Sequence, residues 1–398
     1  MSDTCDILIS GGGIAGLTAA AAFGTGGFKV ICVDPTPPII DGTAEGADLR
    51  STAMLQPARI LLERAGLWDN LAPHAAPLQV MRIIDAGGAE SEPRVTREFD
   101  AADISDQPFG WNFPNWLLRR EMIKRLEALE TVDFRAGIGT KRLFTRVGGA
   151  KVTLSDESTV QSKLVIAADG RNSPMRTAAG ISVRTQRYGQ KALVFVVTHP
   201  IPHENVSTEI HRTGGPFTLV PLPDRDRLPC SAVVWMDDGR LIKERLEMDV
   251  AHFEDEASVR STHHFGPLTL VSPRQAWPIV TQHANRLNAE RLALIAEAAH
   301  VMPPIGAQGL NMSLTDIATL LDLAQERREG LGDAKMLEAY HTERYGDITL
   351  RVRGIDLLNR ASQAGSTVAR DARAAGLSAL YSAAPVRKML MQMGLGMR

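Results

Sequence analysis

DILISGGGIAG, from Asp6 to Gly16, is the stretch that decides the fold. Its first five residues have the apolar character of a buried strand, and they run directly into a glycine-rich turn followed by an alanine-rich, helix-like segment. A second apolar strand, FKVICVD, covers residues 28–34 and ends in an acidic residue. Strand, GxGxxG turn, helix and strand in this order predict one βαβ unit of the kind that binds dinucleotides.

The glycines of the turn have separate physical tasks. Gly11 permits a tight turn, Gly13 lets the backbone approach a pyrophosphate, and Gly16 allows close packing of helix on strand. The pyrophosphate would lie at the helix N-terminus, where free N–H groups and the helix dipole favour an anion. Asp34 is placed to bind the adenosine ribose. The alternative is a glycine-rich turn that binds nothing. The residues predicted to contact the cofactor here are Gly11, Gly13, Ile14, Ala15, Gly16 and Asp34.

Composition bounds the class of protein. The chain has 398 residues, of which 44% are hydrophobic, so we expect two or three domains with sizeable cores. A net charge of −2 provides no field to recruit nucleic acid, which we do not expect as a partner. The three cysteines, Cys5, Cys32 and Cys230, lack metal-ligand spacing, so no metal site is predicted. Their odd number, without a secretory segment, favours the cytoplasm.

Two distant segments add to the βαβ unit. Residues 140–168 predict a three-stranded meander that ends in DGRNSPMR, from Asp169 to Arg176. An apolar strand at residues 291–296 leads into EAAHVMPPIGAQGLN, residues 297–311. From the end of this run onward, four apolar side chains share one helical face, namely Leu310, Leu314, Ile317 and Leu321.

The three segments together resemble the fingerprints of a known family. GxGxxG, DGxxSxxR and the PPxGxQG region have the order and rough spacing of the single-component flavin monooxygenases of the aromatic-hydroxylase type, which include para-hydroxybenzoate hydroxylase. The resemblance covers about residues 5–345. The run GWNFPNWLLRREM, residues 110–122, and the long C-terminal extension look most like the bacterial ubiquinone-biosynthesis hydroxylases.

The resemblance implies an α/β fold with α+β elements. It contains a Rossmann-like FAD-binding domain, a second, β-sheet substrate domain and a C-terminal helical extension. The expected boundaries are 1–75, 111–180 and 277–345 for the discontinuous FAD-binding domain, 76–110 and 181–276 for the substrate domain, and 346–398 for the extension.

Carried over residue by residue, the resemblance also implies roles for side chains outside the glycine turn. Arg50 and Arg120 match arginines that lie near FAD, while Asp169 and Gly170 belong to a motif proposed to contact both FAD and the pyridine nucleotide. Backbone N–H groups at the start of the helix near Leu310 would offer positive potential to the reduced flavin. The loop beneath the isoalloxazine ring would contain Pro303, Pro304, Gly306, Gly309, Leu310 and Asn311.

One departure from the family pattern is visible. Where relatives have Gly-Asp before Ala-Ala-His, this chain has Ala296 and Glu297. The carboxylate is retained, so we expect Glu297 to contact the FAD ribityl chain or pyrophosphate from one methylene further away. The Cβ of Ala296 needs additional backbone room. His300 is expected to be a structural neighbour of FAD.

Substrate contacts are expected from the segment between the second and third fingerprints. Residues 190–276 alternate strand-like runs with turns, which predicts a sheet that covers the flavin. No catalytic side chain stands out, and for each apolar side chain the alternative is packing within the sheet. The substrate-facing candidates are Phe217, Leu219, Val220, Pro221 and Trp235, with Pro303 and Pro304 of the loop.

The reaction that the resemblance implies is hydroxylation with O2. NADH or NADPH reduces FAD, and one oxygen atom enters the electron-rich ring of a lipophilic aromatic substrate, a polyprenylated ubiquinone precursor. Three alternatives stay open: a hydroxylase of a small soluble phenol, another FAD oxidoreductase, and a non-catalytic flavin-binding subunit of a quinone-biosynthesis complex.

The C-terminal part of the chain carries a separate signal. From Arg351 onward there are eight basic and two acidic residues, so this part has a net charge of +6. Val386, Met389, Leu390 and Met393 have the spacing of one helical face. Such a helix would bind peripherally to the inner face of an anionic membrane, dock on another quinone-biosynthesis enzyme, or pack on the protein's own core.

Overall fold

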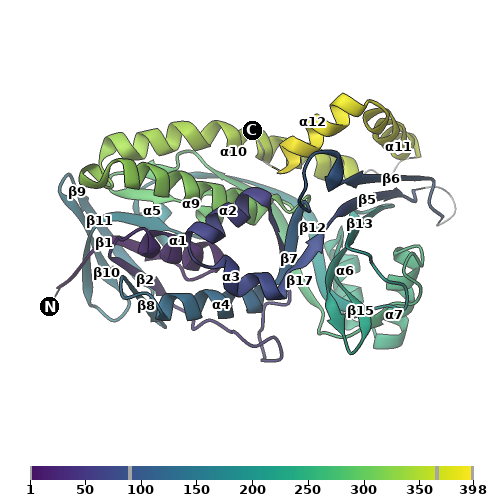
Figure 1. The fold of residues 1–398 in the computed structure, drawn as a ribbon, viewed down its shortest axis with the longest axis horizontal. Coiled ribbons are helices and arrows are strands. Elements are labelled where there is room, and N and C mark those ends of the chain that lie inside the picture. Colours follow the sequence, from purple (N-terminus) through teal and green to yellow (C-terminus); the bar gives the residue numbers. More distant parts are fainter. Residues whose placement is uncertain (1, 88–91, 364–366, 396–398) are drawn as a thin grey trace.

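The computed structural model describes residues 2–87, 92–363 and 367–395. It has the predicted α/β architecture, in which helices pack on two large sheets and the chain ends in helices (Figure 1). Within the described residues no helix combines the length and the apolar character that crossing a bilayer requires.

The first sheet contains the predicted βαβ unit. Strands β19, β11, β1, β2 and β8 are parallel and follow one another in this order across the sheet. Strands β9, β10 and β11 form the antiparallel meander expected for residues 140–168, which confirms that prediction. The strand bounds are β1 (Ser2–Ser10), β2 (Val30–Asp34), β8 (Val132–Ala136), β9 (Thr140–Arg146), β10 (Gly149–Leu154), β11 (Thr159–Ala167), β18 (Asn288–Ala289) and β19 (Leu292–Leu294).

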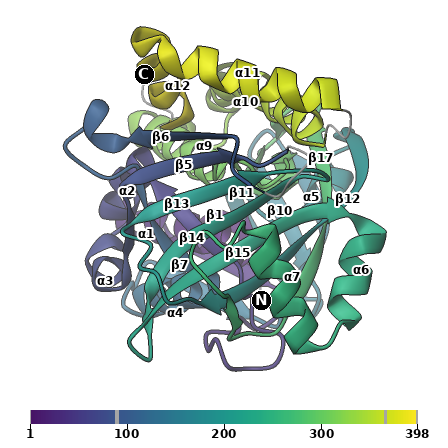
Figure 2. The ribbon, with the colours of Figure 1, turned by 90° about the vertical axis from the view of Figure 1, so that its right-hand side faces the viewer.

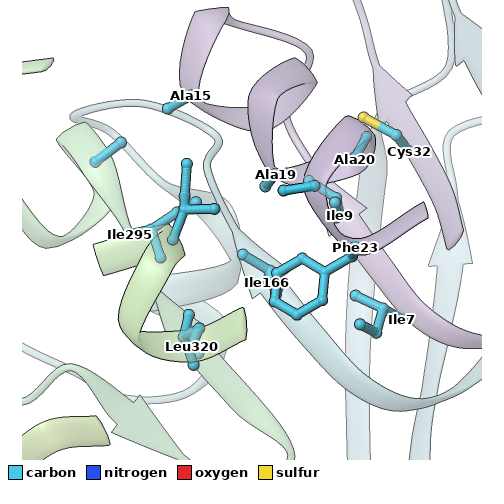
Figure 3. Close-up of a cluster of buried hydrophobic side chains, with 14 of the residues drawn as sticks. Ile7, Ile9, Ala15, Ala19, Ala20, Phe23, Cys32, Ile166, Ile295 and Leu320 are labelled. Atoms are coloured by element: carbon cyan, nitrogen blue, oxygen red, sulfur yellow. The ribbon is translucent and has the colours of Figure 1, made fainter. Parts of the chain in front are cut away.

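Helix α1 (Ile14–Thr25) is buried along nearly its whole length because it packs on β1 and β2 and also against α4 (Asn115–Glu127) and α9 (Gln308–Glu326). Its alanines allow this close approach from several sides. Figure 3 shows Ala15, Ala19, Ala20 and Phe23 meeting side chains of the sheet and of α9. This core fixes the position of the glycine turn at the end of β1.

The second sheet is mostly antiparallel. Its strands follow the order β20, β17, β12, β15, β14, β13, β5 and β6, with β16 paired to β12, and only β13 and β5 pair in parallel. The bounds are β5 (Val80–Asp85), β6 (Val95–Asp100), β12 (Val183–Thr198), β13 (Val206–His211), β14 (Pro216–Arg225), β15 (Leu228–Asp238), β16 (Thr269–Leu270), β17 (Gln275–Ala284) and β20 (His300–Val301).

Both faces of the second sheet are apolar, and each packs against a different part of the chain. Helices α6 (Gly239–Glu247) and α7 (Val250–Arg260) cover one face and close a core around Phe195 and Phe253. On the opposite face, Met236 packs with Ile305, which belongs to the loop before α9. We call this second surface the loop face of the sheet.

A small third sheet and several short helices complete the body of the molecule. In this sheet β7 lies between β3 and β4. The bounds are β3 (Ser51–Leu55), β4 (Ala76–Leu78), β7 (Gly110–Pro114), α2 (Gln56–Arg64), α3 (Trp68–Leu71), α5 (Pro174–Ala178) and α8 (Ala296–Ala299).

The chain ends in the helices α10 (Ala334–Ser362), α11 (Thr367–Ser382) and α12 (Ala384–Leu395), which lie along one side of the molecule in both views (Figures 1 and 2). α11 rests on the edge of the second sheet, where Tyr381 packs edge-on against Phe99 and Asp371 pairs with Arg94 at 2.6 Å. These three helices therefore bridge the second sheet and the helical layer of the first.

Candidate cofactor-binding site

The glycine turn after β1 is shaped by close backbone contacts. A Cβ on Gly11, whose φ is +110°, would lie 2.3 Å from the carbonyl oxygen of Ala168, and a Cβ on Gly16 would lie 1.9 Å from that of Gly11. A Cβ on Gly13 would meet nothing within 4 Å. The first and third glycines are therefore required by packing, whereas the second borders open space.

The N-terminus of α1 faces this space without a counter-charge of its own. Gly13 is the N-cap residue, no side chain caps the helix, and its first turn contains no acidic residue. Asp34 accepts hydrogen bonds from the backbone N–H of Gly12 at 2.6 Å and from that of Thr36 at 2.8 Å. These bonds hold the Asp34 carboxylate beside the turn. Its remaining lone pairs could accept hydrogen bonds from hydroxyl groups.

Asp169 follows β11 and reaches the same end of the sheet. One carboxylate oxygen, Oδ2, accepts from the Ser10 hydroxyl at 3.3 Å and from the Met175 N–H at 3.1 Å. The other, Oδ1, is buried without a hydrogen-bond partner, and burial raises the pKa of this carboxyl group. Gly170 has a φ of +82°, which a side chain would oppose. An unsatisfied buried acceptor of this kind indicates a site for a ligand with donor groups.

Arg50 lies in a charged cluster that the sequence did not reveal. Its guanidinium pairs with Asp48 at 2.7 Å and lies over the Trp277 ring at 4.3 Å. Burial alone would raise the pKa of Asp48, but hydrogen bonds and charge from Arg50, Asn115 and Arg119 lower it below its ordinary value. Asp48 is therefore an anion that orients Arg50.

The structure brings Glu297 near this cluster and leaves Arg120 with local contacts. The negative charge of Glu297 helps to raise the pKa of Arg50. The Glu297 carboxylate also lies 3.4 Å from Arg171. Arg120 donates to its neighbour Glu121 at 2.7 Å on α4. Ala296 has a φ of +54°, so the residue that replaces the family's glycine does adopt a left-handed conformation, at a cost of about 1 kcal/mol.

The loop before α9 contains two consecutive left-handed residues, Gly306 at +63° and Ala307 at +56°. The Asn311 side chain ties this loop to β3, since its amide donates to the carbonyls of Ala307 and Ala53 at 2.7 Å and its oxygen accepts from the Leu55 N–H at 2.8 Å. A Cβ on Gly309 would meet nothing within 4 Å, whereas Leu310 packs against the core. Asn311 is thus a structural clamp, and open space lies beside Gly309.

The structure divides the substrate-facing candidates of the second sheet between its two faces. Phe217, Leu219 and Trp235 are buried in the core beneath α6 and α7, on the face opposite the loop. Because side chains alternate along a strand, Pro221 lies on the same face as these three residues, and Val220 lies on the loop face. Both faces are apolar, so the sequence alternation could not tell which of them meets the loop. The loop-face residues that it missed include Val234 and Met236.

His300 is part of a buried ionic cluster. Its Nε2 lies 2.7 Å from Asp316 on α9, and the second oxygen of Asp316 accepts from Nε of Arg344 on α10 at 2.8 Å. All three side chains are nearly inaccessible to solvent. This cluster ties β20, which leads into the loop, to the two long helices.

These features fit an extended, anionic dinucleotide. The space at Gly13 and the uncapped helix accommodate a pyrophosphate, Asp34 is held at the ribose position, and the orphan oxygen of Asp169 offers an acceptor. Arg50 is oriented by Asp48 and lies near Glu297. Fold and site together define a Rossmann-type dinucleotide-binding protein with a second, mostly antiparallel sheet.

Comparison with known families gives the particular assignment. The chain belongs to the FAD binding domain family, whose model matches residues 4–350. FAD is therefore the cofactor, as the resemblance implied.

The chain is also similar to individual proteins over nearly its full length. It is 33% identical over 394 residues to the ubiquinone hydroxylase UbiL of Rhodospirillum rubrum, covering 98% of this chain and 89% of that protein. It is 26% identical over 395 residues to the 3-demethoxyubiquinol 3-hydroxylase of Escherichia coli, covering 98% of each. The fold matches that of p-nitrophenol 4-monooxygenase PnpA from Pseudomonas putida, with a TM-score of 0.78 at 17% identity over 99% of this chain and 98% of that one.

Proposed function

We propose that this protein is an FAD-dependent monooxygenase that uses NAD(P)H and O2 to hydroxylate the aromatic ring of a polyprenylated ubiquinone precursor. The observation that carries the proposal is the 33% identity to a ubiquinone hydroxylase along almost the entire chain. A lipophilic aromatic substrate agrees with the apolar character of the loop face, where Val234 and Met236 pack with Ile305.

FAD, once bound and reduced, supplies the activation of O2 for insertion into the ring. The chain provides binding and orientation: the turn at Gly13 and the α1 N-terminus would hold the pyrophosphate, and Arg50 would neutralise part of its charge. The apolar loop face excludes water from the reacting centre. In this proposal residues 1–75, 111–180 and 277–345 bind FAD, residues 76–110 and 181–276 form the substrate domain, and residues 346–398 form the extension.

A second candidate is hydroxylation of a small soluble phenol. It is favoured by the structural likeness to p-nitrophenol 4-monooxygenase, although a likeness at 17% identity concerns the fold alone. The two candidates differ in whether the substrate needs a hydrophobic chain, so a matched pair of phenols separates them.

The test uses purified holoprotein and two substrates with the same ring, one with a prenyl chain and one without. We expect the prenylated phenol to stimulate NADH or NADPH oxidation and to gain one oxygen atom from labelled O2, measured by mass spectrometry. Stimulation by the short phenol alone would support the second candidate. A non-catalytic flavin subunit would show no stimulation with either compound, and that result would refute both.

We also propose a cytoplasmic protein that binds peripherally to the inner face of the membrane through α12. Met391 and Leu395 are buried against the protein, while the predicted apolar face points outward, with exposed fractions of 37, 50, 40 and 52% for Val386, Met389, Leu390 and Met393. The net charge of +6 after residue 350 favours anionic lipid.

Replacing both Met389 and Leu390 with serine is expected to abolish binding to vesicles that contain phosphatidylglycerol, because the outward apolar face is lost. Co-sedimentation with vesicles measures the binding. The matched control replaces Ile201, in the loop after β12, and Leu228, the first residue of β15, which are about as exposed, and it should leave binding intact. Equal sedimentation of the wild-type protein with and without vesicles would contradict membrane binding through α12.

A further inference from the structure

The last turn of α12 is bonded directly to the start of α9. The Gln308 side chain donates from Nε2 to the carbonyl oxygen of Gly394 at 2.8 Å and accepts at Oε1 from Arg351 at 2.8 Å. The same Arg351 nitrogen also lies 3.4 Å from the carbonyl oxygen of Met393. Gln308 and Arg351 therefore join the last turn of α12 to the start of α9, directly after the loop before α9.

Gln308 also supports the strained part of that loop. Its Nε2 donates to the carbonyl oxygen of Gly306 at 2.9 Å. Gly306 and Ala307 are both left-handed, and Ala307 is the N-cap of α9 without a side-chain cap. Such a conformation persists only where surrounding contacts hold it, because each left-handed alanine is unfavourable. The Gln308 amide is one of those contacts.

Arg351 is itself held in place by a chain of ion pairs. Its Nε lies 3.0 Å from Asp347, which pairs with Arg344 at 2.9 Å, and Arg344 pairs with the buried Asp316. The position of Arg351 is thus set by the core of the molecule and not by solvent. The family model ends at residue 350, so both Arg351 and α12 lie outside the matched region.

We propose that Arg351 is a positioning residue for the flavin: through Gln308 it fixes the left-handed loop, with the last turn of α12 as the buttress. In this arrangement the C-terminal helix forms part of the cofactor site although it does not contact FAD. In the FAD site that the family resemblance implies, this loop would lie beneath the isoalloxazine ring, so its geometry would affect FAD affinity and the flavin's midpoint potential. The inference rests on the assigned FAD site and is independent of the substrate.

The test compares Arg351→Gln with the wild-type holoprotein and with Arg360→Gln. Arg360 is a matched control because it also forms an ion pair with an aspartate four residues earlier on α10, Asp356, at 2.9 Å. It lies away from the loop. We expect Arg351→Gln to weaken FAD binding about tenfold, which corresponds to about 1.4 kcal/mol, to shift the midpoint potential and to alter the flavin absorption band. Arg360→Gln should change none of these, and Arg351→Lys should restore part of the affinity.

Gln308→Leu provides a second route to the same result. If Arg351 acts through Gln308, the effects of Arg351→Gln and Gln308→Leu on FAD affinity will be strongly non-additive in the double variant. Unchanged affinity, potential and spectrum in Arg351→Gln would overturn the inference, as would simple additivity with Gln308→Leu. These readouts need no substrate, so a failure of the proposed hydroxylation would leave the test unaffected.

Discussion

Replacing Gly13 with leucine is expected to give a folded but colourless protein. The backbone at Gly13 has φ −69° and ψ 176°, which any residue adopts, and a Cβ there meets no protein atom within 4 Å. The side chain would instead fill the space assigned to the FAD pyrophosphate. We expect FAD affinity to fall at least tenfold, or about 1.4 kcal/mol, measured as flavin content per protein and by titration with FAD.

The matched control is Gly354→Leu, which also adds a side chain where nothing lies within 4 Å but does so on α10. This variant should keep its yellow colour, and both variants should show the wild-type circular dichroism spectrum. Normal flavin content in Gly13→Leu would refute the proposed binding mode. Loss of the native spectrum would instead mean that Gly13, like Gly16, is needed for packing.

Asp316→Leu is expected to cause the largest loss of stability. The substitution removes the carboxylate that pairs with both His300 and Arg344 and leaves the guanidinium of Arg344 buried without that partner. Removing one member of a buried ion pair typically costs about 3–5 kcal/mol. Urea denaturation followed by circular dichroism would measure the free energy of unfolding.

A compensating variant distinguishes the lost charge pair from a packing defect. In Asp316→Leu combined with Arg344→Met, neither charge of this pair remains in the core, so the double variant should recover much of the lost stability. Equal instability of the single and double variants would show that shape, and not the charge balance, governs this position.

The fold and the glycine turn could be predicted from the sequence because local patterns determine them. The strand before Gly11, the helix after it and the meander at residues 140–168 all form as predicted. The left-handed φ of Ala296 also fits the expectation that a glycine would be easier to accommodate there. In each case short-range chemistry, visible in adjacent residues, sets the conformation.

The parts that could not be predicted depend on which surfaces meet in space. Alternation in β14 and β15 identifies two faces, but both are apolar, so the sequence could not show that Phe217 and Trp235 lie in the core beneath α6 and α7. Arg50 pairs with Asp48, and Gln308 accepts a hydrogen bond from Arg351. No sequence motif indicates either contact. Loop-face residues such as Met236 would have been found only by knowing that Ile305 packs there.

The contact between Gly394 and Gln308 has a practical consequence for anyone who purifies this protein. An affinity tag or fluorescent fusion added directly after Leu395 would crowd both the turn that abuts the start of α9 and the outward side of α12. The amino end continues from the first strand at the far end of the molecule (Figure 1). Tags placed there keep the yellow chromophore's surroundings free of foreign sequence.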